Sequence, residues 1–489
     1  MKLLLICKGE YRYFFPHIAH ALKVRHGCHV SAMAFTSPAS RMLEQTRAFE
    51  KVFNLAAHLK SIVPNSDLES CVASLQAWEF AGDVPRVNTM IHADRIISRY
   101  PFQSALRMLA AVRQFWNDLL DEMRLDAIVG EIACATEWVA WSLAHRMEIH
   151  YLVPYPTPVA NKCFFLASPD GVWEPMERVF EHAGDGGLSS RQTQIADEFV
   201  RQFRAKKTKP PFLSGAQRSP LIPNLRELIR RVTRIAFRFQ TFAEDGPYEI
   251  GSYHGTPPWI PVWEDTMRIA RHAISEAAIF ERKIAEGPKV YFPLHVQPEF
   301  TTDVRAPFFT NQIALIENIS KSMPIGYRLI VKEHPGMKGE RNGGYYREIK
   351  KLRNVQLLSP SVDSHQVIQQ SDVVLTITGS SAWEAILYGK PVIAFGPLCY
   401  GFGDLIYRCN NVTDLPVILR RAIHGSKPHH SQILRLVSSL LASAYELEWG
   451  DPIRNPQIAE QANVAKISDA IVKEISSRMS SRAAEALPV

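Results

Sequence analysis

The chain has 489 residues, which is enough for two or three domains of ordinary size with a substantial buried core. With 46% hydrophobic and 21% charged residues, it is not a disordered, collagenous or low-complexity protein. The formal net charge of +7 is concentrated between residues 201 and 240, where eleven basic residues face a single acid. A nucleic-acid-binding protein would usually spread such charge over a reading surface, so we do not expect a nucleic-acid partner.

The seven cysteines are widely spaced, odd in number and without a C-x-x-C pair, which predicts reduced thiols. The apolar run Leu3 to Cys7 is too short for a secretion signal or a membrane span, so we expect a cytoplasmic protein. No dinucleotide, P-loop or zinc-protease motif is present. The absence of any D-x-D pair disfavours a nucleotide diphosphate held through a metal, so we expect neither a metal nor a cofactor.

The first 160 residues predict alternating strands and helices. A strand at 2–7 precedes a helix at about 16–25, which ends at Gly27, and a second strand at 28–35. The pattern recurs as a strand at 126–130, a helix at about 136–146 and a strand at 149–153. Pro154, Pro156 and Pro158 then interrupt regular structure.

Residues from about 170 to 285 are rich in Gly and Pro breaks and surround the basic segment, so we interpret them as a connector and insertion. A second alternating series follows. We expect strands at 289–293, 327–332, 355–358, 373–377 and 391–395, with helices at about 311–322, 364–370, 381–388, 416–423 and 432–446. The tail beyond Arg478 is expected to fray.

Two βα series joined by a connector predict an α/β, GT-B-like protein in which two doubly wound Rossmann-type domains face a cleft. We expect an N-terminal acceptor domain at 1–200, a basic connector at 201–285, a nucleotide-sugar-binding domain at 286–430, and C-terminal helices with a tail at 431–489.

Ligands of such sheets bind beyond the carboxyl ends of the strands, so we inspected the residues that follow each strand. In the turn Thr378 to Ser381, Gly379 permits close backbone approach, and Ser380 and Ser381 supply hydroxyl groups where a helix begins. This turn suits a phosphate. The alternative is that a serine only caps the helix.

A second strand end carries Lys332, His334 and Pro335. Lys332 and His334 would point to the same side if the strand continues, which suits a phosphate or a departing phosphate oxygen. By itself the His-Pro pair is also compatible with a structural turn. Glu384 is placed to reach ribose hydroxyls, or else to complement the start of its helix.

The remaining candidates line the predicted cleft. Glu131 follows the strand at 126–130 and is the best-placed acid for a general base, although a carboxylate at a helix start is the alternative. The other candidates for contacts with donor or acceptor follow the first strand of each series: Lys8, Glu10 and Arg12 in the first, and His295, Gln297 and Glu299 in the second.

These motifs resemble those of the capsular and surface polysaccharide biosynthesis proteins, a family that includes bacterial enzymes transferring Kdo from CMP-Kdo. The resemblance rests on F-P-L-H-V-Q-P-E at 292–299, K-E-H-P at 332–335, G-S-S-A-W-E-A at 379–385 and G-K-P at 389–391. It covers residues 286–400 well and the first domain only in outline. It implies a GT-B fold, no metal, and a nucleotide site at His334, Pro335, Ser380 and Ser381.

The resemblance therefore implies a metal-independent glycosyltransferase of capsule assembly, with a CMP-activated acidic sugar such as Kdo as donor and a glycan or lipid-linked acceptor. His334 would act at the departing phosphate and Glu131 on the acceptor or sugar. One rival is an enzyme with a UDP- or CDP-linked donor, such as an epimerase or a polyol-phosphate transferase. Another is a non-catalytic assembly or export partner.

A helix expected at 224–239 separates apolar from arginine positions. This pattern predicts docking on an anionic membrane, on the inner face of the cytoplasmic membrane. The alternative is an amphipathic helix whose apolar side packs on the protein and whose arginines are solvated.

Overall fold

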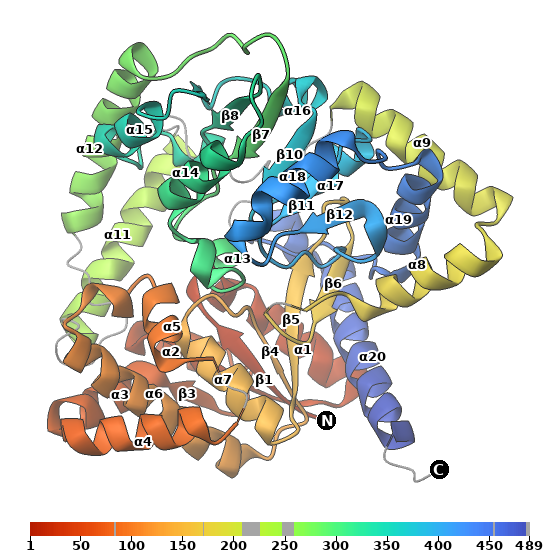
Figure 1. Cartoon of the computed structure of the whole chain (residues 1–489). Coiled ribbons are helices and arrows are strands. Elements are labelled where there is room, and N and C mark those ends of the chain that lie inside the picture. Colours follow the sequence, from red (N-terminus) through yellow and green to blue (C-terminus); the bar gives the residue numbers. More distant parts are fainter. Residues whose placement is uncertain (83–84, 170, 208–224, 247–258, 453–454, 486–489) are drawn as a thin grey trace.

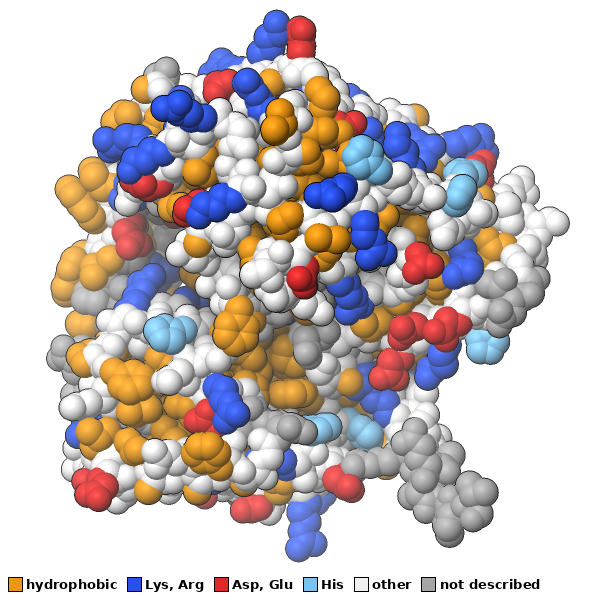
Figure 2. Space-filling view, in the orientation of Figure 1, with side chains coloured by type: hydrophobic (Ala, Val, Ile, Leu, Met, Phe, Trp, Pro, Cys, Tyr) orange, Lys and Arg blue, Asp and Glu red, His pale blue; other side chains and the backbone are white. Residues whose placement is uncertain are grey.

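The computed structural model describes residues 1–489 except 83–84, 170, 208–224, 247–258, 453–454 and 486–489. It consists of two α/β domains, one built on each of two six-stranded sheets (Figure 1). The space-filling surface is hollowed between the two lobes (Figure 2). Among the described residues no helix is long and apolar enough to cross a membrane.

The first sheet has the strand order β3-β2-β1-β4-β5-β6, and β6 is antiparallel to its neighbour. Its strands are buried apolar runs, as expected for a sheet covered on both faces. They are β1 (Lys2–Cys7), β2 (His29–Ala34), β3 (Val52–Asn54), β4 (Ala127–Val129), β5 (His150–Pro156) and β6 (Cys163–Leu166).

The second sheet is parallel throughout and has the order β12-β11-β10-β7-β8-β9. Its strands are β7 (Lys289–Pro293), β8 (Arg328–Lys332), β9 (Val355–Leu358), β10 (Val373–Thr376), β11 (Val392–Ala394) and β12 (Ile406–Arg408). Counted within each domain, both sheets follow the order 3-2-1-4-5-6. The two doubly wound domains expected from the sequence are therefore confirmed, and the ligand-binding crevices are predicted beyond β1 and β4 and beyond β7 and β10.

Helices cover both sheets. The first domain contains α1 (Phe15–His26), α2 (Ser37–Gln45), α3 (Leu55–Ile62), α4 (Leu68–Phe80), α5 (Val87–Ala93), α6 (Phe102–Met123) and α7 (Ala135–Arg146). The second contains α13 (Phe300–Asp303), α14 (Gln312–Ser322), α15 (Gly343–Lys350), α16 (Ser364–Gln370), α17 (Ser381–Leu387), α18 (Leu415–His424) and α19 (His430–Ser443).

The helix expected at 224–239 is present, but the expectation that the rest of 170–285 is only an irregular connector is wrong for much of the described chain. This range contains α8 (Glu174–Gly186), α9 (Ser190–Lys206), α11 (Leu225–Asp245) and α12 (Trp259–Ala278). Gly184 and Gly186, which suggested a break, lie within α8. The basic segment is also divided, because α9 packs beside α19 and α17, whereas α11 lies on α2 and α3 of the first domain.

The end of the chain returns to the first domain. The helix α20 (Gln461–Glu485) packs on α1, where Arg25 holds Asp469 with an N–O distance of 2.8 Å (Figure 1). The expectation of fraying beyond Arg478 is wrong as far as Glu485. Arg478 donates to Glu474 at 2.8 Å and to the backbone oxygen of Tyr151 in β5. These bonds hold this part of α20 against β5.

Candidate functional site

The first-domain side of the cleft is centred on Glu131, which follows β4. The Tyr11 hydroxyl donates to its carboxylate at 2.5 Å, and Trp449 donates to the Tyr11 oxygen at 3.1 Å. Burial raises the pKa of Glu131 above its ordinary value, while the Tyr11 hydrogen bond and the Lys8 charge oppose that rise. A half-buried carboxylate with a raised pKa at a strand end suits a general base.

Lys8, which follows β1, is paired with a second acid, Glu137, which no sequence motif marks. Its ammonium lies 2.9 Å from Glu137 in the first turn of α7, and Glu137 is buried. Burial opposes the charged form of Lys8, but the ion pair with Glu137 outweighs this cost and raises the pKa of Lys8, so it stays protonated. Lys8 is thus a fixed cation beside Glu131.

Glu10 and Arg12 lie at the edge of the same loop, beneath α11. Arg234 of α11 approaches Glu10 at 3.7 Å, and the Arg12 guanidinium lies 3.9 Å from the ring centre of Phe237. Arg12 also donates to the backbone oxygen of Gly9. These two residues therefore connect the loop after β1 to α11.

Arg95 joins the two sides of the cleft, and no motif pointed to it. Burial raises the pKa values of Glu131 in the first domain and of Glu299 and Asp303 in the second, and the charge of Arg95 opposes each of these rises. The neighbouring Asp94 is buried and accepts the backbone N–H of Ala135 at 2.9 Å, which ties this loop to α7. Arg95 is thus an exposed cation near carboxylates of both domains.

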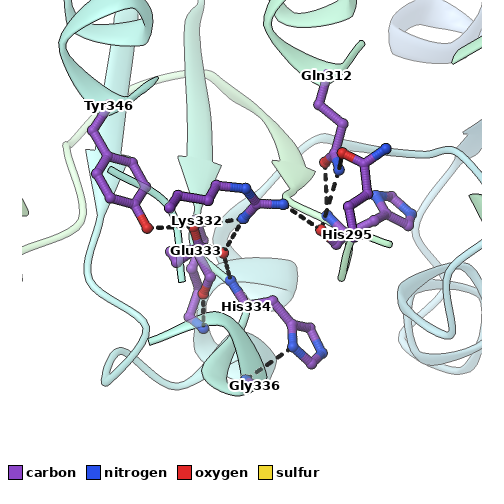
Figure 3. A network of polar contacts seen from close by, with 9 residues as sticks. His295, Gln312, Lys332, Glu333, His334, Gly336 and Tyr346 are labelled. Atoms are coloured by element: carbon purple, nitrogen blue, oxygen red, sulfur yellow. Dashed lines mark hydrogen bonds and ion pairs between the residues drawn. The ribbon is translucent and has the colours of Figure 1, made fainter. Parts of the chain in front are cut away.

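On the second-domain side, a buried ion pair organises the loops after β7 and β8 (Figure 3). Arg341 contacts both oxygens of Glu333 at 2.6 Å, and Tyr346 donates to the same carboxylate at 2.8 Å. The other Arg341 nitrogen donates to the backbone oxygen of His295 at 2.6 Å. Removing one partner of such a pair leaves an uncompensated buried charge, so the pair locks the two loops together.

His295 lies below the cleft surface. Its Nε2 accepts the backbone N–H of Ile377 at 3.2 Å and lies 2.9 Å from the Thr376 hydroxyl. Burial, together with His334 and Arg341, lowers the pKa of His295 to about 3, so the ring is neutral. His295 therefore supports the turn after β10 from beneath.

Lys332 and His334 take different directions from the end of β8 (Figure 3). The Lys332 ammonium is buried and donates to the backbone oxygens of Glu333 and Pro360. His334 is half-buried and accepts the Gly336 N–H on Nδ1 at 3.0 Å, just before the short helix Pro335–Met337. This bond assigns the proton of the neutral ring to Nε2, on the side of the imidazole away from the Glu333 pair.

The turn after β10 has the features expected of a close backbone approach. A Cβ on Gly379 would lie 2.9 Å from His295 Nε2, so only glycine fits without displacement. Neither Ser380 nor Ser381 caps α17 through its side chain, and the Ser381 hydroxyl has no hydrogen-bond partner among the described residues. The capping alternative is therefore wrong. Glu384 is buried. Burial raises the pKa of Tyr291 in β7, and the negative charge of Glu384 raises it further.

Gln297 and Glu299 shape the loop after β7. Gln297 donates to the backbone oxygen of Thr310 at 2.7 Å and accepts from Gln312 at 2.7 Å. Glu299 is reached by solvent, yet surrounding protein raises its pKa, while the hydroxyl of Thr301 opposes the rise. Glu299 thus faces the cleft with Glu131 and Arg95, whereas Gln297 belongs to the scaffold. No group of three or more potential metal ligands occurs among the described residues.

One family model matches part of the second domain. Residues 305–408 fit the family model described as "Capsule polysaccharide biosynthesis protein", a segment that includes the loops after β8 and β10. The capsule polysaccharide modification protein LipA of Neisseria meningitidis serogroup B is 28% identical over 140 residues, which are 28% of this chain and 18% of LipA. Protein FixF of Sinorhizobium fredii is 27% identical over 142 residues, covering 28% of this chain and 33% of FixF.

This chain thus aligns with no more than a third of either relative. A solved structure of Thermosulfurimonas dismutans KpsC, titled as a beta Kdo 2,4 transferase, is 13% identical and has a TM-score of 0.37, with 71% of this chain and 87% of that chain covered. The family resemblance inferred from the motifs is confirmed.

Proposed function

We propose that this chain belongs to the capsule polysaccharide biosynthesis proteins and is a glycosyltransferase that moves an acidic sugar, such as Kdo, from a CMP-activated donor to a glycan or lipid-linked acceptor. The proposal is carried by one coincidence. The matched segment 305–408 holds both His334, with its proton on Nε2, and the two serines whose hydroxyls do not cap their helix.

In the proposed reaction, the nucleotide phosphate binds between the His334 ring and the turn Gly379 to Ser381. Glu131 takes the proton from the acceptor hydroxyl, whose oxygen forms the new bond to the anomeric carbon. The bond from that carbon to the phosphate oxygen breaks, and its electron pair leaves with CMP. The Nε2–H of His334 and the serine hydroxyls stabilise the charge that develops on the phosphate. Lys8 and Arg95 hold the acidic groups of the substrates.

A thermal-shift screen with CMP, UDP, CDP and GDP tests the donor class. Binding of nucleotide to the folded state raises the unfolding temperature, and we expect the largest rise with CMP. A larger rise with UDP or CDP would favour the rival donor classes. The absence of any shift, together with the absence of transfer, would favour the non-catalytic role.

The serine turn provides the first variant test. Replacing Ser380 and Ser381 together by Ala should reduce nucleotide affinity by about tenfold or more, because two hydrogen bonds to a charged phosphate are lost. The unfolding temperature without nucleotide should stay unchanged, since neither hydroxyl caps α17.

The matched control is Ser189→Ala, because Ser189 does cap α9 by accepting the Gln192 N–H. This control should lose about 1 kcal/mol of stability and retain full nucleotide affinity. Destabilisation of the serine double variant with normal nucleotide binding would remove the turn from the site.

Metal independence is the second test. The phosphate partners proposed above are a ring N–H and hydroxyl groups, so activity should persist in excess EDTA. The measurement is the transfer rate before and after chelation, followed by addition of magnesium or manganese. Complete loss that either metal restores would contradict the proposed site.

A further inference from the structure

Two neighbouring helices, α11 and α12, turn apolar side chains toward solvent. Figure 2 shows orange side chains along the left edge of the molecule, where these helices lie in Figure 1. The residues that form this α11–α12 surface are each more than half exposed: Ile229, Val232, Phe239, Trp259, Trp263 and Ile274. Exposed apolar groups gathered in this way mark interaction surfaces of soluble proteins.

The two helices are partly reversed relative to ordinary surface helices, whose apolar side faces the core. In α11, the buried positions Thr241 and Asp245 are polar, and Asp245 accepts the Ser37 N–H at 3.0 Å. In α12, the buried positions Arg268 and Ser275 are polar as well. Polar residues therefore take part of the protein-facing side of each helix, and the six apolar residues of the α11–α12 surface are left largely uncovered by the described residues.

The apolar sides form one continuous surface. Phe242 of α11 packs edge-on against Trp259 of α12, with ring centres 5.9 Å apart. Trp259 and Trp263 are four residues apart and therefore lie on the same side of α12. Phe237 of α11 packs against the core, whereas Ile229, Val232 and Phe239 of the same helix are exposed.

The charge of α11 indicates what covers this surface. Residues 225–239 contain five arginines and one glutamate. Arg234 and Arg238 are both exposed. A second copy of the chain would bring the same positive charge against this surface, whereas an anionic bilayer would neutralise it. Exposed tryptophans are also the side chains most enriched at the boundary between lipid and water.

We propose that the α11–α12 surface docks the protein on an anionic lipid bilayer, with the helices lying along the interface and their apolar side chains entering it. The docking does not depend on the identity of the sugar donor. Because Arg234 of α11 also approaches Glu10 in the loop after β1, the bilayer would lie close to the first-domain side of the cleft.

The test is co-sedimentation of the full chain with vesicles of phosphatidylglycerol and phosphatidylcholine, compared with pure phosphatidylcholine, at low and high salt. We expect binding to the anionic vesicles that weakens with salt. Ile229→Glu combined with Trp263→Glu should reduce the bound fraction at least tenfold. The control combines Phe80→Glu with Ile325→Glu, which are even more exposed and lie outside α11 and α12, and should bind normally.

Arg234→Glu combined with Arg238→Glu should remove most of the salt-sensitive binding. The unfolding temperature of each variant verifies that it is folded. Vesicle binding that the Ile229 and Trp263 changes leave intact would overturn the proposal. It would also be overturned if the protein ignored vesicles and formed a dimer that those same changes disrupt, because the surface would then bind a second copy.

Discussion

Glu131→Gln should lower the rate of sugar transfer by about 10²-fold or more while nucleotide affinity stays nearly unchanged. The amide keeps the shape of the side chain and still accepts the Tyr11 hydrogen bond, but it cannot take a proton from the acceptor. A 10²-fold loss corresponds to about 2.7 kcal/mol of transition-state stabilisation. Nucleotide affinity is spared because Glu131 belongs to the first domain and the proposed phosphate site to the second.

The pH dependence of transfer gives an independent readout. Burial raises the pKa of Glu131, and a base acts only when it is deprotonated. Activity should therefore fall as the pH drops through this raised pKa, which lies above the ordinary glutamate value of about 4.3. In the Glu131→Gln variant the residual activity should lose this acidic limb.

The matched control is Glu122→Gln, which makes the same chemical change on an exposed acid near the end of α6, away from the strand ends. It should leave both the rate and the pH profile unchanged. Near-normal turnover of Glu131→Gln would assign the base to another acid, and Glu299 would be the next to test because it also faces the cleft with a raised pKa.

The two sheets were predictable because their strands are short apolar runs with turn residues at their ends, such as β1 before Gly9 and β7 before His295. The order of strands then follows from the doubly wound pattern. The same logic selects Glu131, His334 and Ser381 as candidates, since each lies in the loop or turn that follows a strand. Sequence position relative to a strand is therefore informative about the site without knowledge of any contact.

Residues that act through tertiary contacts could not be found in this way. Arg95 precedes a short 3-10 helix and Glu137 lies within α7, so neither position signals a cleft. Lys332 and His334 are two residues apart, but β8 ends at Lys332, and the alternation that would align their side chains stops there. The role of Glu333 depends on its ion pair with Arg341. No local sequence pattern predicts that these two side chains meet.

The sequence also could not predict which side of α11 is exposed. Periodicity predicts a separation of apolar from arginine positions in α11, yet the pattern is identical whether the apolar side faces the core or solvent. The orientation is set by partners elsewhere in the chain, such as Ser37, which donates to Asp245. Only the folded contacts could identify which side is exposed.

His334→Ala should weaken binding of CMP by about tenfold to a hundredfold. A hydrogen bond from a ring N–H to a charged phosphate contributes about 1.5–3 kcal/mol, and its loss gives a change of this size. Isothermal titration of the full chain with CMP measures the effect. This variant also removes the Nδ1 acceptor of the Gly336 N–H, so the loop after β8 loses a cap at the same time.

His334→Asn separates these two roles. Asparagine is a good capping residue, so its side-chain oxygen can accept the Gly336 N–H and keep the Pro335–Met337 helix in place. It lacks a group in the position of Nε2. We therefore expect the unfolding temperature of His334→Asn to stay near that of the original protein, while CMP affinity falls nearly as far as in His334→Ala.

The opposite pattern is equally informative. If His334→Asn restored CMP binding while His334→Ala abolished it, the histidine would serve only to cap the loop, and its Nε2 would have no role at the phosphate. If both variants bound CMP normally, His334 would lie outside the nucleotide site. The phosphate would then depend on the turn Gly379 to Ser381, which the serine double variant tests separately.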